Sequence, residues 1–300
     1  LLIRAPRGLS GIYILRVESR GTDASVPIAV RARSRVGLMV VLPMISWLGR
    51  DPVDQSGDGV PDAFGTGEAV RFPRLFAYPE GVPPGLLSDI APLLVRLDEQ
   101  GVRYDLATDL DLTFGDAPTD AQRGVLMAGE PTWVGRELAD RLRTYVDAGG
   151  RLALFGPRAL RATVTVGDAV LARPSTVTAV DALGGRLGEV RDIDTDLTVL
   201  AEDPSLGLLE GFSGQLPGFD RVEELLSPGR GAVKTSVGEE SEKLRPALSA
   251  VAQGKGLVMR VGLPGWGTRL RAGDAAVAQL TDNIVDILRH RTPKARTARG

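Results

Sequence analysis

The apolar run Gly37–Ile45 constrains the fold of this chain more than any other segment. A loop rich in Gly, Asp and Pro follows it. Such an uninterrupted run is typical of a strand buried on both faces of a parallel sheet. Parallel strands need long crossovers, usually helices, so the segments that follow decide whether an α/β domain forms.

Helix and strand patterns alternate after this run. Apolar residues recur at helical spacing in three segments: 86–100, 134–148 and 274–289. Short apolar runs typical of strands occupy five more: 102–107, 124–128, 151–155, 247–252 and 257–263. The last two flank Gly254-Lys255-Gly256, which predicts a hairpin turn. The order predicts a doubly wound, mostly parallel α/β sheet over residues 36–290, with short strands and loops off the sheet in 160–245.

The N-terminal segment has a different period. Residues 11–19 and 25–33 are short β-type segments, and the second alternates apolar and polar positions. Two strands with one apolar face are not stable alone. We therefore expect residues 1–35 to be the last hairpin of an upstream β-sandwich domain in the same, longer protein. Residues 291–300 are expected to be a basic tail.

Composition excludes several classes of site. The 300 residues include no cysteine and one histidine, so disulfides, thiolate metal sites and cysteine nucleophiles are absent. The histidine, His290, ends the last helical pattern, where a cation near the final carbonyls is the simpler interpretation. Residues 36–288 carry a net charge of −12, which disfavours nucleic acid as a partner. No apolar stretch reaches the length of a membrane-spanning helix.

The loop at 54–62 resembles a calcium-binding loop. Asp54, Ser56, Asp58 and Asp62 place oxygen side chains at positions 1, 3, 5 and 9 of an EF-type loop, and the Val60 carbonyl can add a ligand. The bidentate acid of position 12 is missing, so weak, extracellular-range affinity is expected. The alternative is an ordinary turn in which the Asp side chains accept hydrogen bonds from backbone amides. The absence of cysteine does not fix the compartment but is compatible with an oxidising exterior, and we expect an extracytoplasmic, secreted or cell-surface location.

Several blocks together resemble one family. They are VVLPMISW (40–47), DGVPD (58–62), YDLATDLDL (104–112), VLMAGEPTW (125–133), AGGRLALFG (148–156) and GKGLVMRVGLPGW (254–266). In order and spacing they resemble the C-terminal domain of the N,N-dimethylformamidase large (beta) subunit. That resemblance implies a class I glutamine-amidotransferase-like fold, an iron site with two tyrosines and a glutamate, and hydrolysis of small amides.

This chain departs from the pattern that the resemblance implies. Trp47 is followed by Leu48-Gly49-Arg50 rather than by a nearby tyrosine, and Glu130 is the only carboxylate left in the block 129–133. Iron is therefore not expected. Amidotransferase chemistry is not expected either, because Gly156-Pro157-Arg158 after the strand 151–155 offers no nucleophile.

The remaining candidates are carboxylates and aromatic residues at expected strand ends. Glu130, Asp109 and Asp111 are the candidate catalytic or metal-binding acids, although Asp109 and Asp111 are also ordinary cap residues. Trp47, Tyr78 and Trp133 are candidates for a cleft wall, with Trp266 as a fourth aromatic residue. The favoured hypothesis is a non-catalytic binding or structural module with a calcium-stabilised loop. The alternatives are a metal-dependent hydrolase of small amides and a carbohydrate-handling domain.

Overall fold

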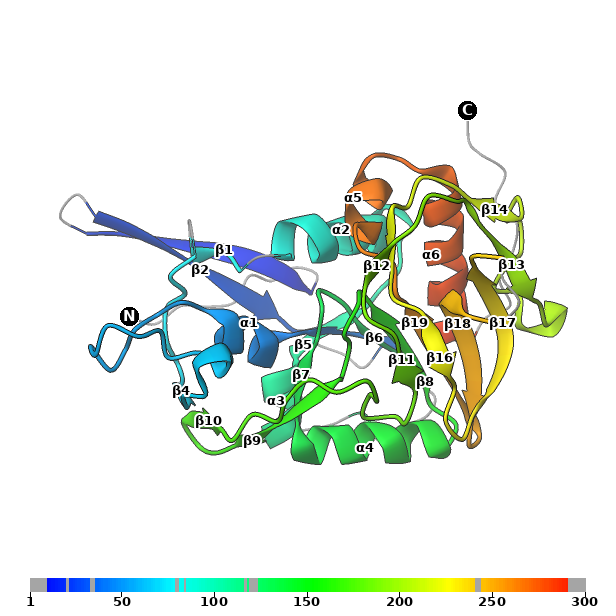
Figure 1. Ribbon diagram of the computed structural model, residues 1–300. Helices are drawn as coiled ribbons and strands as arrows, with labels where there is room; N and C mark the ends of the chain where they lie inside the picture. The colour runs from blue at the N-terminus through cyan, green and yellow to red at the C-terminus, as the bar shows by residue number, and fades with distance from the viewer. Residues whose placement is uncertain are drawn as a thin grey trace.

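The computed structural model describes residues 10–19, 22–32, 36–78, 81–83, 85–115, 118, 124–240 and 244–290. Its main feature is a sheet of nine strands in the order β14-β13-β17-β18-β19-β8-β6-β3-β5 (Figure 1). Five strands are parallel: β3 (Leu38–Leu42), β5 (Asp105–Thr108), β6 (Gly124–Met127), β8 (Arg151–Phe155) and β19 (Gly256–Val261). The other four continue the sheet antiparallel: β13 (Leu197–Ala201), β14 (Gln215–Leu216), β17 (Ala232–Gly238) and β18 (Pro246–Gln253).

The five parallel strands have the doubly wound order. Taken along the chain they lie in the order second, first, third, fourth, fifth, so the winding reverses between β3 and β6. The strand β3 is buried at all five positions, as expected for a strand covered on both faces. Ligands of doubly wound sheets bind outside the carboxyl ends of the strands at this reversal.

Helices cover both faces of the sheet. Side chains of α2 (Ala91–Glu99) and α6 (Ala275–Leu288) pack with one face of β3, together with α5 (Trp266–Arg271). Side chains of α4 (Arg136–Asp147) and α3 (Asp109–Phe114) pack with the other face. Figure 1 shows α4 below the sheet and α2, α5 and α6 above it. The helix α1 (Met44–Arg50) follows β3, and a π-helical turn, η3 (Leu86–Ile90), precedes α2.

Smaller pieces surround the sheet. A four-stranded sheet joins β4 (Val70–Arg71), β10 (Val170–Ala172), β9 (Ala162–Val166) and β7 (Trp133–Gly135). Two strand pairs are β11 (Arg186–Leu187) with β16 (Leu225–Ser227), and β12 (Arg191–Asp192) with β15 (Arg221–Val222). The 3-10 turns are η1 (Phe64–Thr66) and η4 (Pro204–Leu206). No helix in the described part of the chain is long and apolar enough to cross a membrane.

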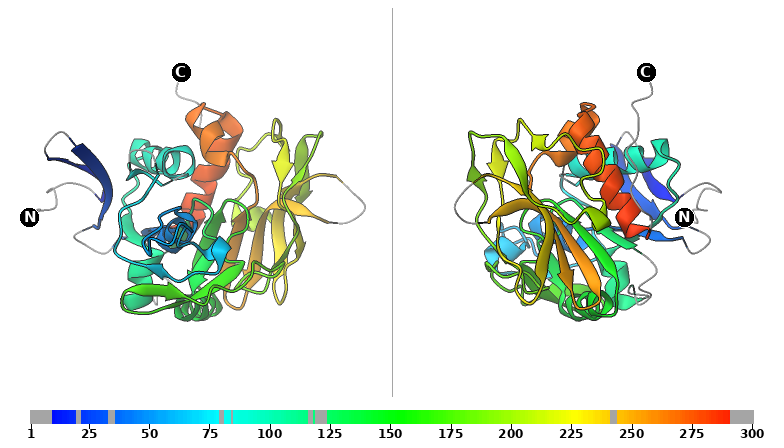
Figure 2. Two further views of the ribbon diagram at one scale, coloured as in Figure 1. Left: turned by 60° about the vertical axis from the view of Figure 1, so that its left-hand side comes forward. Right: turned by 90° about the vertical axis from the view of Figure 1, so that its right-hand side faces the viewer.

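The N-terminal strands β1 (Gly11–Ser19) and β2 (Thr22–Val30) form a separate antiparallel hairpin. Figure 2 shows it standing beside the main body. Ile12 and Ala29, which pair across the hairpin, pack against the main core, whereas Tyr13 and Val17 are exposed. Arg31, just after β2, donates to the carboxylate of Asp105 at 2.8 Å. The hairpin is therefore attached to the edge strand β5 by side chains and not by strand pairing. Its origin in an upstream sandwich stays a prediction.

The α/β class is confirmed, but the sheet is mixed rather than mostly parallel. The predicted turn at Gly254 and Lys255 is present, and it joins β18 and β19 into an antiparallel hairpin. Part of the segment 160–245, expected to lie off the sheet, instead supplies β13, β14 and β17. Half of the strand pairings within the nine-stranded sheet are consequently antiparallel. The glutamine-amidotransferase-like assignment stays a prediction, and the expected tail 291–300 lies outside the described residues.

Candidate functional site

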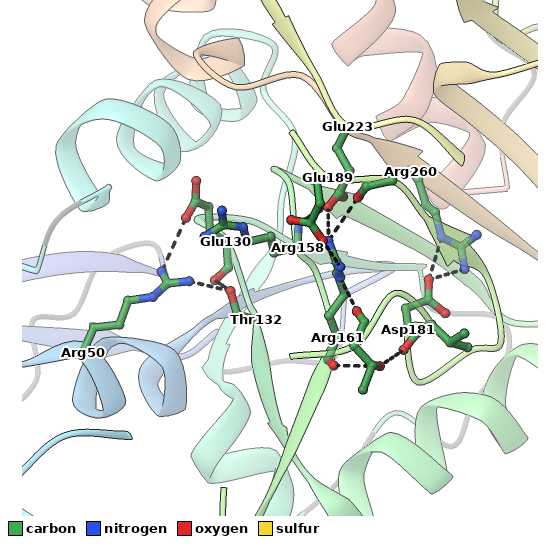
Figure 3. Close-up of polar contacts among 12 residues, drawn as sticks. Arg50, Glu130, Thr132, Arg158, Arg161, Asp181, Glu189, Glu223 and Arg260 are labelled. Atoms are coloured by element: carbon green, nitrogen blue, oxygen red, sulfur yellow. Dashed lines mark hydrogen bonds and ion pairs between the residues drawn. The ribbon is translucent and has the colours of Figure 1, made fainter. Parts of the chain in front are cut away.

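Two charged side chains meet where the winding of the sheet reverses. Arg50 ends α1, which follows β3, and Glu130 lies three residues beyond the end of β6. Their side chains form an ion pair with 3.5 Å between Arg50 Nη1 and Glu130 Oε2 (Figure 3). Both are partly open to solvent, at 34% and 40% exposure. A ligand approaching this edge therefore meets a half-exposed cation and a half-exposed anion together.

The backbone at Glu130 is strained. Its φ is 58°, in the left-handed region that a residue with a side chain seldom adopts, and the preceding Gly129 has φ of 77°. The turn is held by a 2.7 Å hydrogen bond from the Thr132 amide to the Glu130 carbonyl. Strained backbone of this kind concentrates at functional sites, so the geometry marks Glu130 as a site residue.

Arg50 is oriented by three neighbours. It donates to Thr132 Oγ1, pairs with Glu130, and lies 5.4 Å from the ring centroid of Trp133. Ser46, one turn earlier in α1, accepts from the Trp133 amide at 3.0 Å and joins the helix to β7. Burial lowers the pKa of Arg50 from its ordinary value, but the Glu130 charge opposes that shift. The guanidinium is thus fixed in place with part of its donor edge still exposed.

A small cavity adjoins Glu130. It measures about 50 Å³ and is lined by Asp89, Phe155 and Trp266 as well as by the turn at Gly129 and Glu130. Burial raises the pKa of Asp89, and repulsion from the Glu130 carboxylate adds to the rise. The cavity has room for a small ligand or a few waters, with two acids and two aromatic rings around it.

A buried ion-pair network positions the neighbouring loop after β8. Arg161 Nη1 donates to Glu223 Oε1 at 3.0 Å, and both side chains are almost fully buried. Glu223 also accepts from the Arg158 amide, and Arg161 pairs at 2.7 Å with the exposed Glu189. Figure 3 shows this network beside a second buried pair, Asp181 with Arg260. The network holds Arg158, whose φ is 60°, close to the Glu130 turn.

The other two candidate acids are occupied in helix capping. Asp109 is fully buried, and its Oδ1 accepts from the Ile45 amide at 3.0 Å, which ties α1 to α3. Burial raises its pKa to about 8, and Oδ2 has no hydrogen-bond partner. Asp111 forms a reciprocal capping box with Thr108 at the start of α3. Among the residues that the structure describes, no three His, Cys, Asp or Glu side chains gather as metal ligands do, so Glu130, Asp109 and Asp111 do not form one such group.

The four aromatic candidates have different surroundings. Trp133 stacks on Arg50 and contacts Phe64, with 5.2 Å between ring centroids. Tyr78 donates to the Trp47 carbonyl at 3.4 Å, and burial raises its pKa to about 12. Trp47 itself is in the core, and its buried indole Nε1 has no hydrogen-bond partner. Trp266 lies in the cavity wall, with 6.1 Å between its ring centroid and that of Phe155.

In the loop at 54–62 the acidic side chains fold the backbone. Asp54 accepts from the Gly57 and Gly59 amides at 2.6 and 2.7 Å, and Asp62 accepts from the Gln55 and Ser56 amides. These amide bonds lower the pKa of Asp54. Gly57 and Gly59 adopt positive φ, as the sharp turn requires. Asp54 and Asp62 thus accept hydrogen bonds from backbone amides, as in an ordinary turn, and calcium binding by the loop stays a prediction.

Sequence reasoning missed Arg50, Asp89 and Arg158 as site residues. Arg50 and Glu130 are 80 positions apart, so nothing local in the sequence pairs them. Two weak signals were present. Arg50 is the last residue of the helix that follows the first parallel strand, and the Gly129-Glu130 dipeptide follows a strand and allows a left-handed turn.

Comparison with known proteins gives one family and several distant structures. The family described as N,N-dimethylformamidase beta subunit-like, C-terminal matches residues 4–169, from the hairpin to β9. No curated protein matches the chain. A β-galactosidase from Rahnella sp. R3 is 16% identical, with a TM-score of 0.42 over 66% of this chain and 26% of that one. A cytoplasmic protein from Salmonella typhimurium LT2 is 10% identical, with a TM-score of 0.41 over 93% of this chain and 96% of that one. The chain spans about a quarter of the β-galactosidase's length.

Proposed function

The chain belongs to the N,N-dimethylformamidase beta subunit-like, C-terminal family, and from that premise we propose that it is a ligand-binding domain without hydrolytic activity. One observation carries the proposal: each candidate acid already has a partner in the fold. Glu130 pairs with Arg50, Asp109 caps α1, and Asp111 closes the capping box of α3. A metal-dependent hydrolase would need these acids to converge on one water or one ion, whereas each is fixed by a different bond.

We propose that the ligand is a small amide bound at the Arg50–Glu130 ion pair. The Arg50 guanidinium offers donors to the carbonyl oxygen of the amide, and Glu130 holds that guanidinium in place. The Trp133 ring and the cavity walls Phe155 and Trp266 supply apolar contacts. A metal-dependent hydrolase, the competing function, would require Glu130, Asp109 and Asp111 to converge on one ion. The separate bonds of Asp109 and Asp111 argue against it.

We test the site with dimethylformamide, using saturation-transfer NMR to measure binding. We expect a Kd on the order of 1–10 mM for so small a ligand. Replacing Arg50 with Ala should weaken binding by roughly tenfold, because a hydrogen bond to a charged group is lost. Arg143→Ala, which removes an exposed arginine of α4, is the matched control and should bind as the wild type does. Equal binding to the wild type and the Arg50 variant would place the ligand elsewhere.

We further propose that the loop at 54–62 binds calcium and that the protein acts outside the cytoplasm. Three acids within nine residues, two glycines at positive φ and the exposure of Asp54 and Asp58 to solvent support a weak cation site. The exposed Tyr13 and Val17 on β1 support docking of the hairpin on an upstream β-sandwich domain.

Calcium should raise the melting temperature through this loop. An ion that binds only the folded state stabilises it by about 1.4 kcal/mol at a tenfold excess over Kd. Asp58→Ala should remove this gain in millimolar calcium and change little in chelator. Glu68→Ala, an exposed acid outside the motif, should keep it. The readout is differential scanning calorimetry with calcium and with chelator, and a wild-type curve indifferent to calcium contradicts the proposal.

A further inference from the structure

A further cavity lies away from Glu130, beneath the N-terminal hairpin. It measures about 220 Å³, and its walls come from β2, α1, the segment 72–76 and the start of α3. Apolar side chains dominate these walls: Val26, Met44, Leu48, Leu75, Phe76 and Leu110. An apolar cavity of about 150 Å³ is large enough to bind benzene, so this one has room for an aromatic ring and more.

Besides Arg74, three polar residues line the cavity: Ser25, Thr108 and Asp111. Thr108 and Asp111 belong to the capping box of α3, in which the Thr108 amide donates to Asp111 Oδ2 at 3.1 Å. Asp111 is exposed, and no cation pairs with it among the described residues. Its carboxylate is therefore a hydrogen-bond acceptor and a negative charge at the edge of an apolar space.

The one cation in the wall is already neutralised. Arg74 Nε lies 3.4 Å from the buried carboxylate of Asp51, and its other nitrogens donate to the Leu48, Asp51 and Asp62 carbonyls. Both side chains of this ion pair are buried. The charge that a ligand meets in the cavity is therefore that of Asp111.

We propose that this cavity binds a small organic amine with an apolar body, in which the ammonium pairs with Asp111 and the body fills the space among Met44, Leu75 and Phe76. The pattern is that of ligand sites in general: an apolar concave surface with a few polar groups that set orientation. The site is separate from the Arg50–Glu130 site and does not depend on the function proposed for it.

Phenethylamine and phenethyl alcohol are the matched probes, since they share an aromatic body and differ in charge. Isothermal titration at pH 7 should give a Kd on the order of 0.1–1 mM for the amine. The alcohol should bind roughly two- to fivefold more weakly, the value of one exposed ion pair. Asp111→Asn keeps an oxygen for the capping box and should abolish this preference. Leu75→Ala should weaken both probes roughly two- to fivefold and leave their ratio unchanged.

Two controls separate this site from the rest of the molecule. Leu87→Ala removes an equally exposed leucine outside the cavity and should bind both probes as the wild type does. Glu130→Gln should also leave both affinities unchanged, so a failure here is distinct from a failure at the Glu130 site. The proposal is overturned if neither probe saturates, if amine and alcohol bind equally to the wild type, or if the preference persists in Asp111→Asn.

Discussion

Replacing Glu223 with alanine is expected to lower the free energy of unfolding by about 3–5 kcal/mol, because it leaves the buried guanidinium of Arg161 without its buried partner. The Glu223 and Arg161 side chains are 3% and 2% exposed. The change also removes the acceptor of the Arg158 amide. Chemical denaturation at neutral pH measures the loss directly.

The same arginine supplies a matched control. Glu189 pairs with Arg161 at 2.7 Å but is 75% exposed, so Glu189→Ala should cost at most about 1 kcal/mol. If the two variants lose equal stability, the network is not the buried anchor of the loop after β8. Because that loop lies beside Glu130, Glu223→Ala should also weaken dimethylformamide binding, while Glu189→Ala should not.

Asp109→Asn is expected to stabilise the protein increasingly as pH rises. Burial raises the folded-state pKa of Asp109 to about 8 from its ordinary value of 3.8. Between these two values the folded state holds a proton that the unfolded state has released, so stability falls as pH rises through this window. Asparagine removes the titration and keeps an oxygen for the Ile45 amide bond.

Melting temperatures at pH 5 and pH 8.5 test this expectation. A single pKa unit is worth about 1.4 kcal/mol. If the stability difference between the two pH values equals only that of one pKa unit, the melting temperature of the variant should rise relative to that of the wild type by roughly 2–4 °C. The buried Oδ2 of Asp109 has no hydrogen-bond partner, which is the reason for expecting a gain rather than a loss. Parallel pH curves for the wild type and the variant would show that Asp109 is ionised at little cost in the folded state.

Local patterns predicted the framework of the fold well. Residues Leu38–Leu42 of the apolar run at Gly37–Ile45 form the buried strand β3, although Ile45 already belongs to α1, and the turn at Gly254 and Lys255 joins β18 to β19 as expected. Asp274 caps α6, with its side chain accepting from the Ala276 and Val277 amides. His290 lies just beyond the end of that helix. These features depend on periodicity and capping within a few residues, which a single sequence contains.

The antiparallel half of the sheet could not be predicted in the same way. The strand β13 pairs with β17 across the intervening residues 202–231, and β17 pairs in turn with β18. Short strands broken by Gly and Pro carry little periodicity, so the sequence did not distinguish sheet strands from loops in this part. Their pairing depends on tertiary packing rather than on local preference.

In the candidate site, too, contacts between neighbouring residues could be predicted and contacts between distant residues could not. The Thr108-to-Asp111 spacing is a readable capping signal, and the structure uses both residues in that role. The partners of Glu130 and Glu223 are arginines 80 and 62 positions away, and neither pair follows from residue spacing. The sequence therefore indicated Glu130 as a candidate but not the ion pair that determines what it can do.

Hydrolysis of dimethylformamide is the most direct test of the proposal that this domain binds without catalysis. The NMR sample used for binding also reports dimethylamine, and glutamine is tested in parallel by ammonia release, each with iron, zinc or calcium added. We predict a binding signal for dimethylformamide and no product above the uncatalysed rate with any of the three metals. Product formation well above that rate, abolished by Glu130→Gln, would contradict the proposal and identify the domain as a metal-dependent amide hydrolase.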